Sequence, residues 1–347
     1  MADKQHIVRL LQKSRIDDAK KLCKKLCKSQ PGDAEAWYML GAIHGQLGEY
    51  DKAEACCHTA LKIAPAHPGL HYNLAVARIN QGKFKDAIAD FERAIELNPA
   101  YAEAYHDLGN AYQYLKDHKK AIACYNQAIS LQPRIAAIYF NLANALVDIN
   151  QLDEAVEAYR KAVGLQPDFE QAYSGLANIL IQQFKYSKLI DILAPALAIL
   201  PDSPDIIFKL GVAYQELGDA EEAMNAYRRV LAVAPDHVDA KAGMAGVLYV
   251  MGRYDEAYRE ISDTIDNRTE NPATAIVFSH LAPHLERSGE AIDLLEHYRE
   301  NAELTDNTLS KICFSLGKLY DARGDYDDAF NCYRSGNEKR YARYDAG

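Results

Sequence analysis

Asparagine side chains recur at regular intervals in this 347-residue chain and are its strongest candidates for recognising a ligand. They lie in four segments: Tyr72–Asn73–Leu74, Asp107–Leu108–Gly109–Asn110, Asn141–Leu142–Ala143–Asn144 and Leu176–Ala177–Asn178. Each asparagine amide offers both a hydrogen-bond donor and an acceptor. A row of such amides can pair with the backbone of an extended peptide whatever side chains the peptide carries. The chemistry that this pattern predicts is reversible hydrogen bonding.

Side chains for catalysis do not occur in a known arrangement. The sequence contains no G-x-x-x-x-G-K-[ST], G-x-G-x-x-G, G-x-S-x-G or H-E-x-x-H motif. His280 and His284 have a spacing that holds zinc on an unbroken helix, but Pro283 lies between them and no third ligand is evident. We therefore expect no catalytic residue, no metal site and no cofactor within this chain.

Composition favours a folded protein and argues against nucleic acid as the partner. The chain is 49% hydrophobic and 25% charged, with a formal net charge of −10, whereas phosphate binding needs clustered Lys and Arg. Residues 1–30 are basic, which is typical of a solvated face or of contact with a membrane or an acidic partner. Seven Cys residues without a C-x-x-C pair indicate reduced thiols, and no signal peptide or membrane span is visible. We expect a cytoplasmic protein.

Regularly spaced prolines reveal the elements that must position the asparagines. The interval between successive prolines is 34 residues in the series Pro31, Pro65, Pro99, Pro133, Pro167, Pro201 and Pro235. With each proline at position 32, the repeats begin at residues 34, 68, 102, 136, 170, 204 and 238. An internal period of this length is typical of stacked helical repeats.

Each repeat contains the apolar pattern of two helices. Positions 4, 7, 8 and 11 lie on one face of a first helix, and positions 20, 24 and 27 lie on the matching face of a second. Small residues at positions 8, 20 and 27 allow the helices to approach closely. Glycine at position 15 of several repeats can adopt a positive φ and end the first helix, and the proline at position 32 ends the second.

The pattern Trp37–Leu40–Gly41, Ala53, Ala60 and Pro65 resembles the tetratricopeptide repeat. This resemblance implies an all-α, right-handed superhelical solenoid of about ten antiparallel helix pairs. We expect a degenerate N-terminal capping repeat (1–33), seven regular repeats (34–271), a longer irregular repeat (272–309), and a last repeat with a C-terminal linker (310–347).

Two repeats depart from the pattern. The repeat that begins at residue 170 has Phe184 where glycine is usual, and Pro195 lies inside its second helix, which predicts a kink or early break near residues 193–195. The repeat 272–309 has four extra residues, which we expect in the loop 301–307 as a tolerated surface insertion.

The asparagines occupy positions 6 and 9 of the first helices, which line the concave side of such solenoids. The predicted peptide-binding residues are Asn73, Asn110, Asn141, Asn144 and Asn178, with the position-5 aromatics Tyr72, Phe140 and Phe208 as apolar contacts. This run resembles the asparagine ladder in the repeat arm of O-linked N-acetylglucosamine transferase, where the ladder residue sits mainly at position 6. Alternatively, the asparagines bridge neighbouring helices, and some of the aromatics pack between repeats.

The end of the chain resembles the last repeat of bacterial proteins that join these repeats to a sulfotransferase domain. The matching residues are Phe314–Tyr320, Gly324–Tyr326, Ala329–Phe330 and Gly336–Asn337. Three functions remain open: a scaffold that holds an extended peptide or protein segment, the substrate-recognition arm of a longer transferase, and a structural scaffold that assembles with itself.

Overall fold

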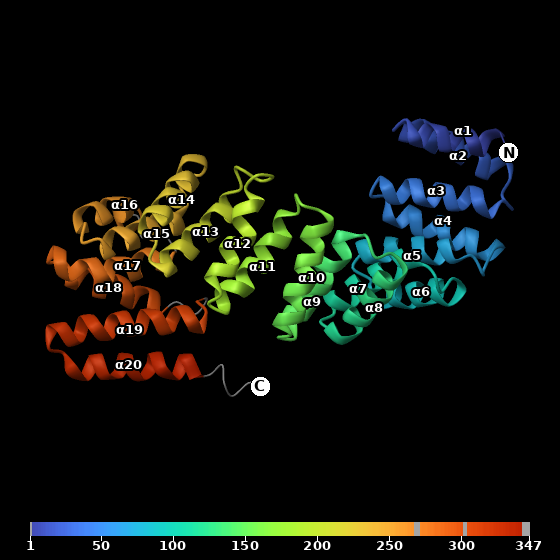
Figure 1. Ribbon diagram of the computed structural model, residues 1–347. Coiled ribbons are helices and arrows are strands. Elements are labelled where there is room, and N and C mark those ends of the chain that lie inside the picture. The colour runs from blue at the N-terminus through green and yellow to red at the C-terminus, as the bar shows by residue number, and fades with distance from the viewer. Residues whose placement is uncertain (1, 267–270, 301–303, 342–347) are drawn as a thin grey trace. The chain divides into compact units, whose positions relative to one another are not determined.

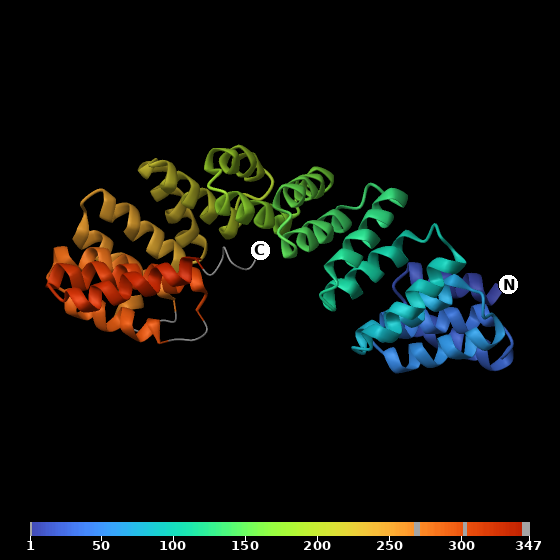
Figure 2. The ribbon, with the colours of Figure 1, turned by 90° about the horizontal axis from the view of Figure 1, so that it is seen from below.

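The regular secondary structure of the described residues is entirely helical. A computed structural model describes residues 2–266, 271–300 and 304–341, and no β-strand occurs among them. The chain divides into two compact units, unit 1 (Met1–Leu176) and unit 2 (Ala177–Gly347). Within each unit, helices joined by short turns form antiparallel pairs that stack side by side (Figure 1 and Figure 2).

Unit 1 contains five helix pairs and the start of a further helix. Its helices are α1 (Ala2–Gln12), α2 (Ile16–Ser29), α3 (Ala34–Gln46), α4 (Tyr50–Ile63), α5 (Pro68–Asn80), α6 (Phe84–Leu97), α7 (Ala102–Tyr114), α8 (His118–Leu131), α9 (Ala136–Asp148), α10 (Leu152–Leu165) and the beginning of α11 (Glu170–Gln182). The odd-numbered helices are the first helices of the predicted repeats. From α3 to α11, they begin at the predicted repeat starts.

Unit 2 contains the end of α11 and the remaining helices. They are α12 (Tyr186–Ala196), α13 (Pro204–Leu217), α14 (Ala220–Val233), α15 (Val238–Val250), α16 (Tyr254–Asp266), α17 (Pro272–Leu281), the 3₁₀ helix η1 (Ala282–Leu285), α18 (Ser288–Arg299), α19 (Asp306–Arg323) and α20 (Tyr326–Tyr341). The all-α repeat architecture that the period predicts is confirmed.

The turn between the two helices of a repeat requires a left-handed backbone. The residue at position 15 has a positive φ in Gly48, Gly82, Lys116, Asn150, Phe184, Gly218, Gly252, Glu286 and Gly324. Glycine adopts this conformation without steric cost, whereas in any other residue the Cβ atom makes the left-handed conformation higher in free energy. The geometry of the turn is therefore retained even where Phe184 replaces glycine.

A close contact between positions 8 and 24 holds the two helices of a repeat together. A Cβ added to Gly109 on α7 would lie 2.6 Å from the ring of Tyr125 on α8, and one added to Gly211 on α13 would lie 2.7 Å from the ring of Tyr227 on α14. Both rings are 1% exposed. The large side chain at position 24 thus fits only against a small residue at position 8.

The two departures from the pattern have different outcomes. Helix α12 ends at Ala196, one residue after Pro195, and has 11 residues where α10 has 14, which confirms the early break. The extra residues of the repeat 272–309 do not all lie in the loop, because Asp306 and Asn307 begin α19. The Thr305 side chain caps this helix by accepting from the Thr308 N–H. Residues 301–303 lie outside the described part.

Replacement of Gly109 by alanine tests the contact between positions 8 and 24. Alanine favours a helix over glycine by about 1 kcal/mol, but the clash with the buried Tyr125 ring outweighs this gain. We expect Gly109→Ala to destabilise unit 1 by about 1–2 kcal/mol. Gly164→Ala on α10 is the matched control, because an added Cβ there meets nothing within 4 Å. Urea unfolding measures both variants, and equal stability of Gly109→Ala and wild type would contradict the prediction.

Candidate functional site

Four of the predicted asparagines lie on the first helices of unit 1. Asn73 is on α5, Asn110 on α7, and Asn141 and Asn144 on α9, and all four are half-buried. Asn178 is exposed on α11, within unit 2. The helical spacing places position 6 and position 9 one turn apart, on the same side of each first helix.

A hydrogen-bond network connects three first helices of unit 1. The Tyr72 hydroxyl donates to Asp107 Oδ2 over 2.7 Å, and Asn110 Nδ2 donates to Asp107 Oδ1 over 3.3 Å. Asn110 Oδ1 accepts from the Tyr125 hydroxyl and from Asn141 Nδ2, each over 2.9 Å. The donor and acceptor groups of Asn110 are therefore engaged within the protein, as the bridging alternative expects.

Tyr72 and His106, at the two ends of the network, are both neutral, as their hydrogen bonds require. Burial raises the pKa of the Tyr72 hydroxyl, and the Asp107 carboxylate raises it further, so the hydroxyl remains a donor. Burial lowers the pKa of His106. Its neutral ring accepts from Asn141 Nδ2 through Nε2 over 3.0 Å. Asn141 thus uses its Nδ2 group for His106 and Asn110, while its Oδ1 has no hydrogen-bond partner among the described residues.

Asn144 is oriented in the opposite sense. Its Oδ1 accepts from the hydroxyl of Tyr159 on α10, and its Nδ2 makes no hydrogen bond with any residue in the described ranges. Neither Asn141 Oδ1 nor Asn144 Nδ2 is a buried unsatisfied atom, whereas Asn73 Nδ2 is buried without a hydrogen-bond partner. One turn of α9 therefore presents a free acceptor and a free donor.

The predicted aromatic contacts pack between repeats. The Tyr72 ring lies 5.0 Å from that of Tyr101, and the Phe140 ring lies 4.9 Å from that of Phe169. In unit 2 the Phe208 ring lies 5.1 Å from that of His237. Each partner precedes the next first helix, and each of the three aromatics is only half-buried.

A pocket of about 300 Å³ opens between α5 and α7. Asp107 and Asn110 line one part of it, and its apolar wall contains Val76, Phe84 and Tyr114. The Phe84 and Tyr114 rings stack 3.7 Å apart, and the Tyr114 side chain is 66% exposed. This wall was not predicted from the sequence, although the aromatic Tyr114 at position 13 of a first helix was a signal for it.

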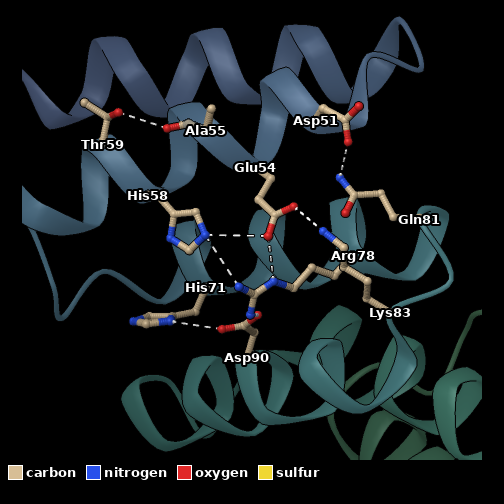
Figure 3. A network of polar contacts seen from close by, with 10 residues as sticks. All are labelled: Asp51, Glu54, Ala55, His58, Thr59, His71, Arg78, Gln81, Lys83 and Asp90. Atoms are coloured by element: carbon tan, nitrogen blue, oxygen red, sulfur yellow. Dashed lines mark hydrogen bonds and ion pairs between the residues drawn. The ribbon is translucent and has the colours of Figure 1, made fainter.

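A charged network lies between α4, α5 and α6 (Figure 3). Arg78 on α5 donates from Nε to Glu54 on α4 over 3.0 Å and from Nη1 to Asp90 on α6 over 2.7 Å. Lys83 Nζ lies 2.9 Å from Glu54. Burial opposes ionisation of Glu54, but the hydrogen bonds from Lys83, Arg78 and Gln81 outweigh it and lower the pKa of Glu54 to about 2. Burial raises the pKa of Asp90, although Arg78 opposes this effect.

Neither a metal site nor a membrane-spanning helix occurs in the described ranges. In residues 2–266, 271–300 and 304–341, no group of three or more His, Cys, Asp or Glu side chains is arranged to hold a metal ion. No helix in these ranges is long and apolar enough to cross a membrane. The rings of His280 and His284 instead pack near the ring of Tyr249.

Family profiles match most of this architecture. Profiles described as tetratricopeptide repeat match residues 34–67, 102–135, 124–157, 176–245, 216–275 and 310–337, and one described as TPR repeat matches 77–115 and 143–183. The chain belongs to the tetratricopeptide repeat family. Repeats of this kind stack into extended surfaces on which other proteins bind, so the general role of this tetratricopeptide repeat protein is protein interaction.

Known proteins are similar to parts of this chain in sequence or in fold. The human protein O-mannosyl-transferase TMTC1 is 26% identical over 130 residues, which is 38% of this chain but only 15% of TMTC1. The C-terminal part of a TPR repeat-containing protein from Cytophaga hutchinsonii has a TM-score of 0.58 at 18% identity, over 69% of this chain and 98% of that one. A tetratricopeptide repeat protein from Parabacteroides merdae has a TM-score of 0.54 at 14% identity, over 71% and 98%. These two structures show the fold alone.

The hydroxyl partners of the asparagines have a sequence signal that we did not use. Asn110 pairs with Tyr125 and Asn144 with Tyr159, and both pairs are separated by 15 residues. This is the separation between positions 9 and 24 of one repeat. Asn178 has Leu193 at the corresponding position, so its repeat lacks the hydroxyl.

The lowered pKa of Glu54 predicts how the stability of unit 1 depends on pH. Because the pKa falls from 4.5 to about 2 on folding, the stabilisation by ionised Glu54 is complete above about pH 4.5 and is lost as the pH falls towards 2. We expect Glu54→Gln to cost about 1–2 kcal/mol at pH 7 and almost nothing near pH 2. Urea unfolding of both proteins across this range measures the difference. A difference that does not change with pH would contradict the role of Glu54.

Proposed function

We propose that this tetratricopeptide repeat protein holds an extended polypeptide along the first-helix face of unit 1, and that α9 hydrogen-bonds the backbone of that polypeptide. The observation that carries the proposal is the pair of free polar atoms on α9, Asn141 Oδ1 and Asn144 Nδ2. An extended residue offers an N–H and a C=O that pair with one acceptor and one donor, as in an antiparallel ladder. The amide oxygen of Asn141 accepts from the peptide N–H, and the amide nitrogen of Asn144 donates to the peptide C=O.

The network around these amides supports binding because it fixes their orientation before the ligand arrives. Asn110 and His106 hold the Asn141 nitrogen, and Tyr159 holds the Asn144 oxygen. A ligand that meets oriented groups pays less conformational entropy than one that must order them. In this proposal Asn110 positions Asn141 and does not contact the peptide.

The pocket between α5 and α7 supplies a place for a peptide side chain. Its volume of about 300 Å³ and its wall of Phe84 and Tyr114 suit an apolar or aromatic side chain. Asn73 lies on the same face, but its unpaired Nδ2 is buried, so it contacts a peptide only if its side chain turns outward. Asn178, at position 9 of its repeat, is the candidate in unit 2. The half-buried rings of Tyr72 and Phe140 are proposed as apolar contacts on the first-helix face of unit 1, and that of Phe208 as one on the first helices of unit 2.

Recognition of the backbone predicts binding that depends on these two amides but hardly on the sequence of the peptide. We expect Asn141→Ala/Asn144→Ala to weaken binding of mixed-sequence peptides by about tenfold or more, because two hydrogen bonds are lost. Replacing the peptide amides by N-methyl amides has a similar effect on the wild-type protein, because the donor to Asn141 is removed. Fluorescence anisotropy of labelled peptide pools measures both changes.

Asn225→Ala is the matched control, since Asn225 is exposed on the second helix α14. Circular dichroism establishes that each variant retains its helices. Equal peptide affinity of wild type and the double variant, with both folded, removes the α9 amides from consideration.

A second candidate function is the substrate-recognition arm of a transferase. The similarity to part of TMTC1 favours it, as does the resemblance of the last repeat to repeats fused to sulfotransferase domains. Both functions predict peptide binding, so the transcript that encodes the chain distinguishes them. A transferase domain encoded before residue 1 or after residue 347 supports the second candidate, and an open reading frame that encodes none contradicts it.

A further inference from the structure

The space between neighbouring second helices of unit 1 is filled differently in successive repeats. Three equivalent positions meet there: position 21 of the preceding second helix, position 11 of the first helix between them, and position 23 of the following second helix. Between α4 and α6 these positions hold Glu54, Arg78 and Asp90. Between α8 and α10 they hold Ile122, Leu146 and Ala158. The repeats therefore act as internal controls for one another.

Polar side chains cross both the space between α4 and α6 and the space between α6 and α8, and they contact each other there. Figure 3 shows Arg78 extending between Glu54 and Asp90, with hydrogen bonds of 3.0 and 2.7 Å. In the next space, the Tyr112 hydroxyl on α7 donates to Glu92 on α6 over 2.8 Å. Lys120 Nζ on α8 lies 5.0 Å from the centre of the Tyr112 ring. These side chains occupy the spaces between the neighbouring second helices.

Between α8 and α10 the three equivalent positions are all apolar, and a groove of about 670 Å³ lies there. Its floor is α9, where Leu142 and Leu146 are 8% and 7% exposed. Half-buried Ile122 and Tyr139 flank this floor. Ala158 stands where α6 has Asp90, so position 23 of α10 offers no carboxylate to such a bridge. An apolar groove of this volume is large enough for several side chains of a bound segment.

The rim of the groove is acidic. Asp153, Glu154 and Glu157 on α10 line it, against one cation, Lys161. All four are exposed. Glu154 has no ion pair or hydrogen bond with any residue in the described part of the chain, and Glu157 shares only a 3.4 Å contact with the exposed Arg160. An exposed pair of this kind contributes little, so Glu157 remains available to a ligand.

We propose that this groove binds a basic amphipathic helix of a partner protein. The apolar side chains of that helix lie on Leu142 and Leu146, and its Lys or Arg side chains pair with Glu154 and Glu157. The exposed carboxylates of Glu154 and Glu157 against one ammonium select a cationic segment, and the apolar floor between two helices suits a helix with one apolar stripe. The groove shares no lining residue with the pocket between α5 and α7, so this inference is independent of the proposed peptide-backbone site.

Two labelled peptides provide the probe. Both have leucine at every third or fourth position, as an amphipathic helix requires, and the remaining positions are lysine in one and glutamate in the other. Fluorescence anisotropy at low salt is expected to detect binding of the lysine peptide only. In Glu154→Lys/Glu157→Lys, affinity for the lysine peptide falls about tenfold and affinity for the glutamate peptide rises, because two attractions become repulsions.

Glu96→Lys on α6 is the matched control, because Glu96 is also an exposed second-helix carboxylate with a weak pairing, to Arg93. It leaves both affinities unchanged. A second variant, Ile122→Glu/Leu146→Arg/Ala158→Asp, copies the charged bridge of the α4–α6 space into the groove and abolishes binding of the lysine peptide. If circular dichroism shows that this triple variant does not fold, the proposal is tested by Glu154→Lys/Glu157→Lys and its control Glu96→Lys alone.

Three results overturn the proposal. The first is that the lysine peptide binds Glu154→Lys/Glu157→Lys as tightly as it binds wild type. The second is that only Asn141→Ala/Asn144→Ala weakens its binding, because the peptide then lies on the first-helix face. The third result is self-association of the chain that sedimentation detects and Glu154→Lys/Glu157→Lys removes, because the groove is then a contact between copies of this chain.

Discussion

The close approach of the two helices within a repeat is the constraint on which the rest of the structure depends. A small residue at position 8 leaves space for the side chain at position 24 to insert beneath the first helix. At Gly109 this space is so tight that an added methyl group would lie 2.6 Å from the Tyr125 ring. The buried ring excludes water from the pair, and stacking of successive pairs extends the core along each unit.

The same insertion connects the core to the candidate binding face. Where position 24 is tyrosine and position 9 is asparagine, the ring is buried and its hydroxyl reaches the amide on the adjoining turn of the first helix, as in Tyr125 with Asn110 and Tyr159 with Asn144. The core side chain thereby determines which atom of the amide faces outward. At α9 this leaves the oxygen of Asn141 and the nitrogen of Asn144 free, and the proposed backbone recognition depends on that arrangement.

The sequence predicted the fold well because the fold follows from local patterns. The proline interval set the repeat frame, and Pro272 and Pro204 begin first helices as that frame requires. The early end of α12 followed from Pro195 alone. The extension of α19 was not predicted, because the Thr305 cap was not recognised as a helix start.

The binding face was predicted only in part, because contacts between helices determine which of its polar groups are already hydrogen-bonded within the protein. The asparagines were found from their spacing, but that Asn110 is engaged by Tyr125 and Asn141 depends on side chains from three helices. The pocket with Phe84 and Tyr114 and the groove above Leu146 depend on which side chains leave space unfilled. A pattern read along one helix does not contain that information.

The most direct test is the peptide affinity of Tyr159→Phe, measured by calorimetric titration with mixed-sequence peptides. The substitution keeps the buried ring that packs against Gly175 but removes the hydroxyl that orients Asn144. The account predicts that the helices are retained and the thermal midpoint falls only slightly, while affinity falls about fivefold because Asn144 is no longer oriented before the peptide binds. Unchanged affinity in the folded variant would contradict the claim that the core tyrosines orient the binding amides.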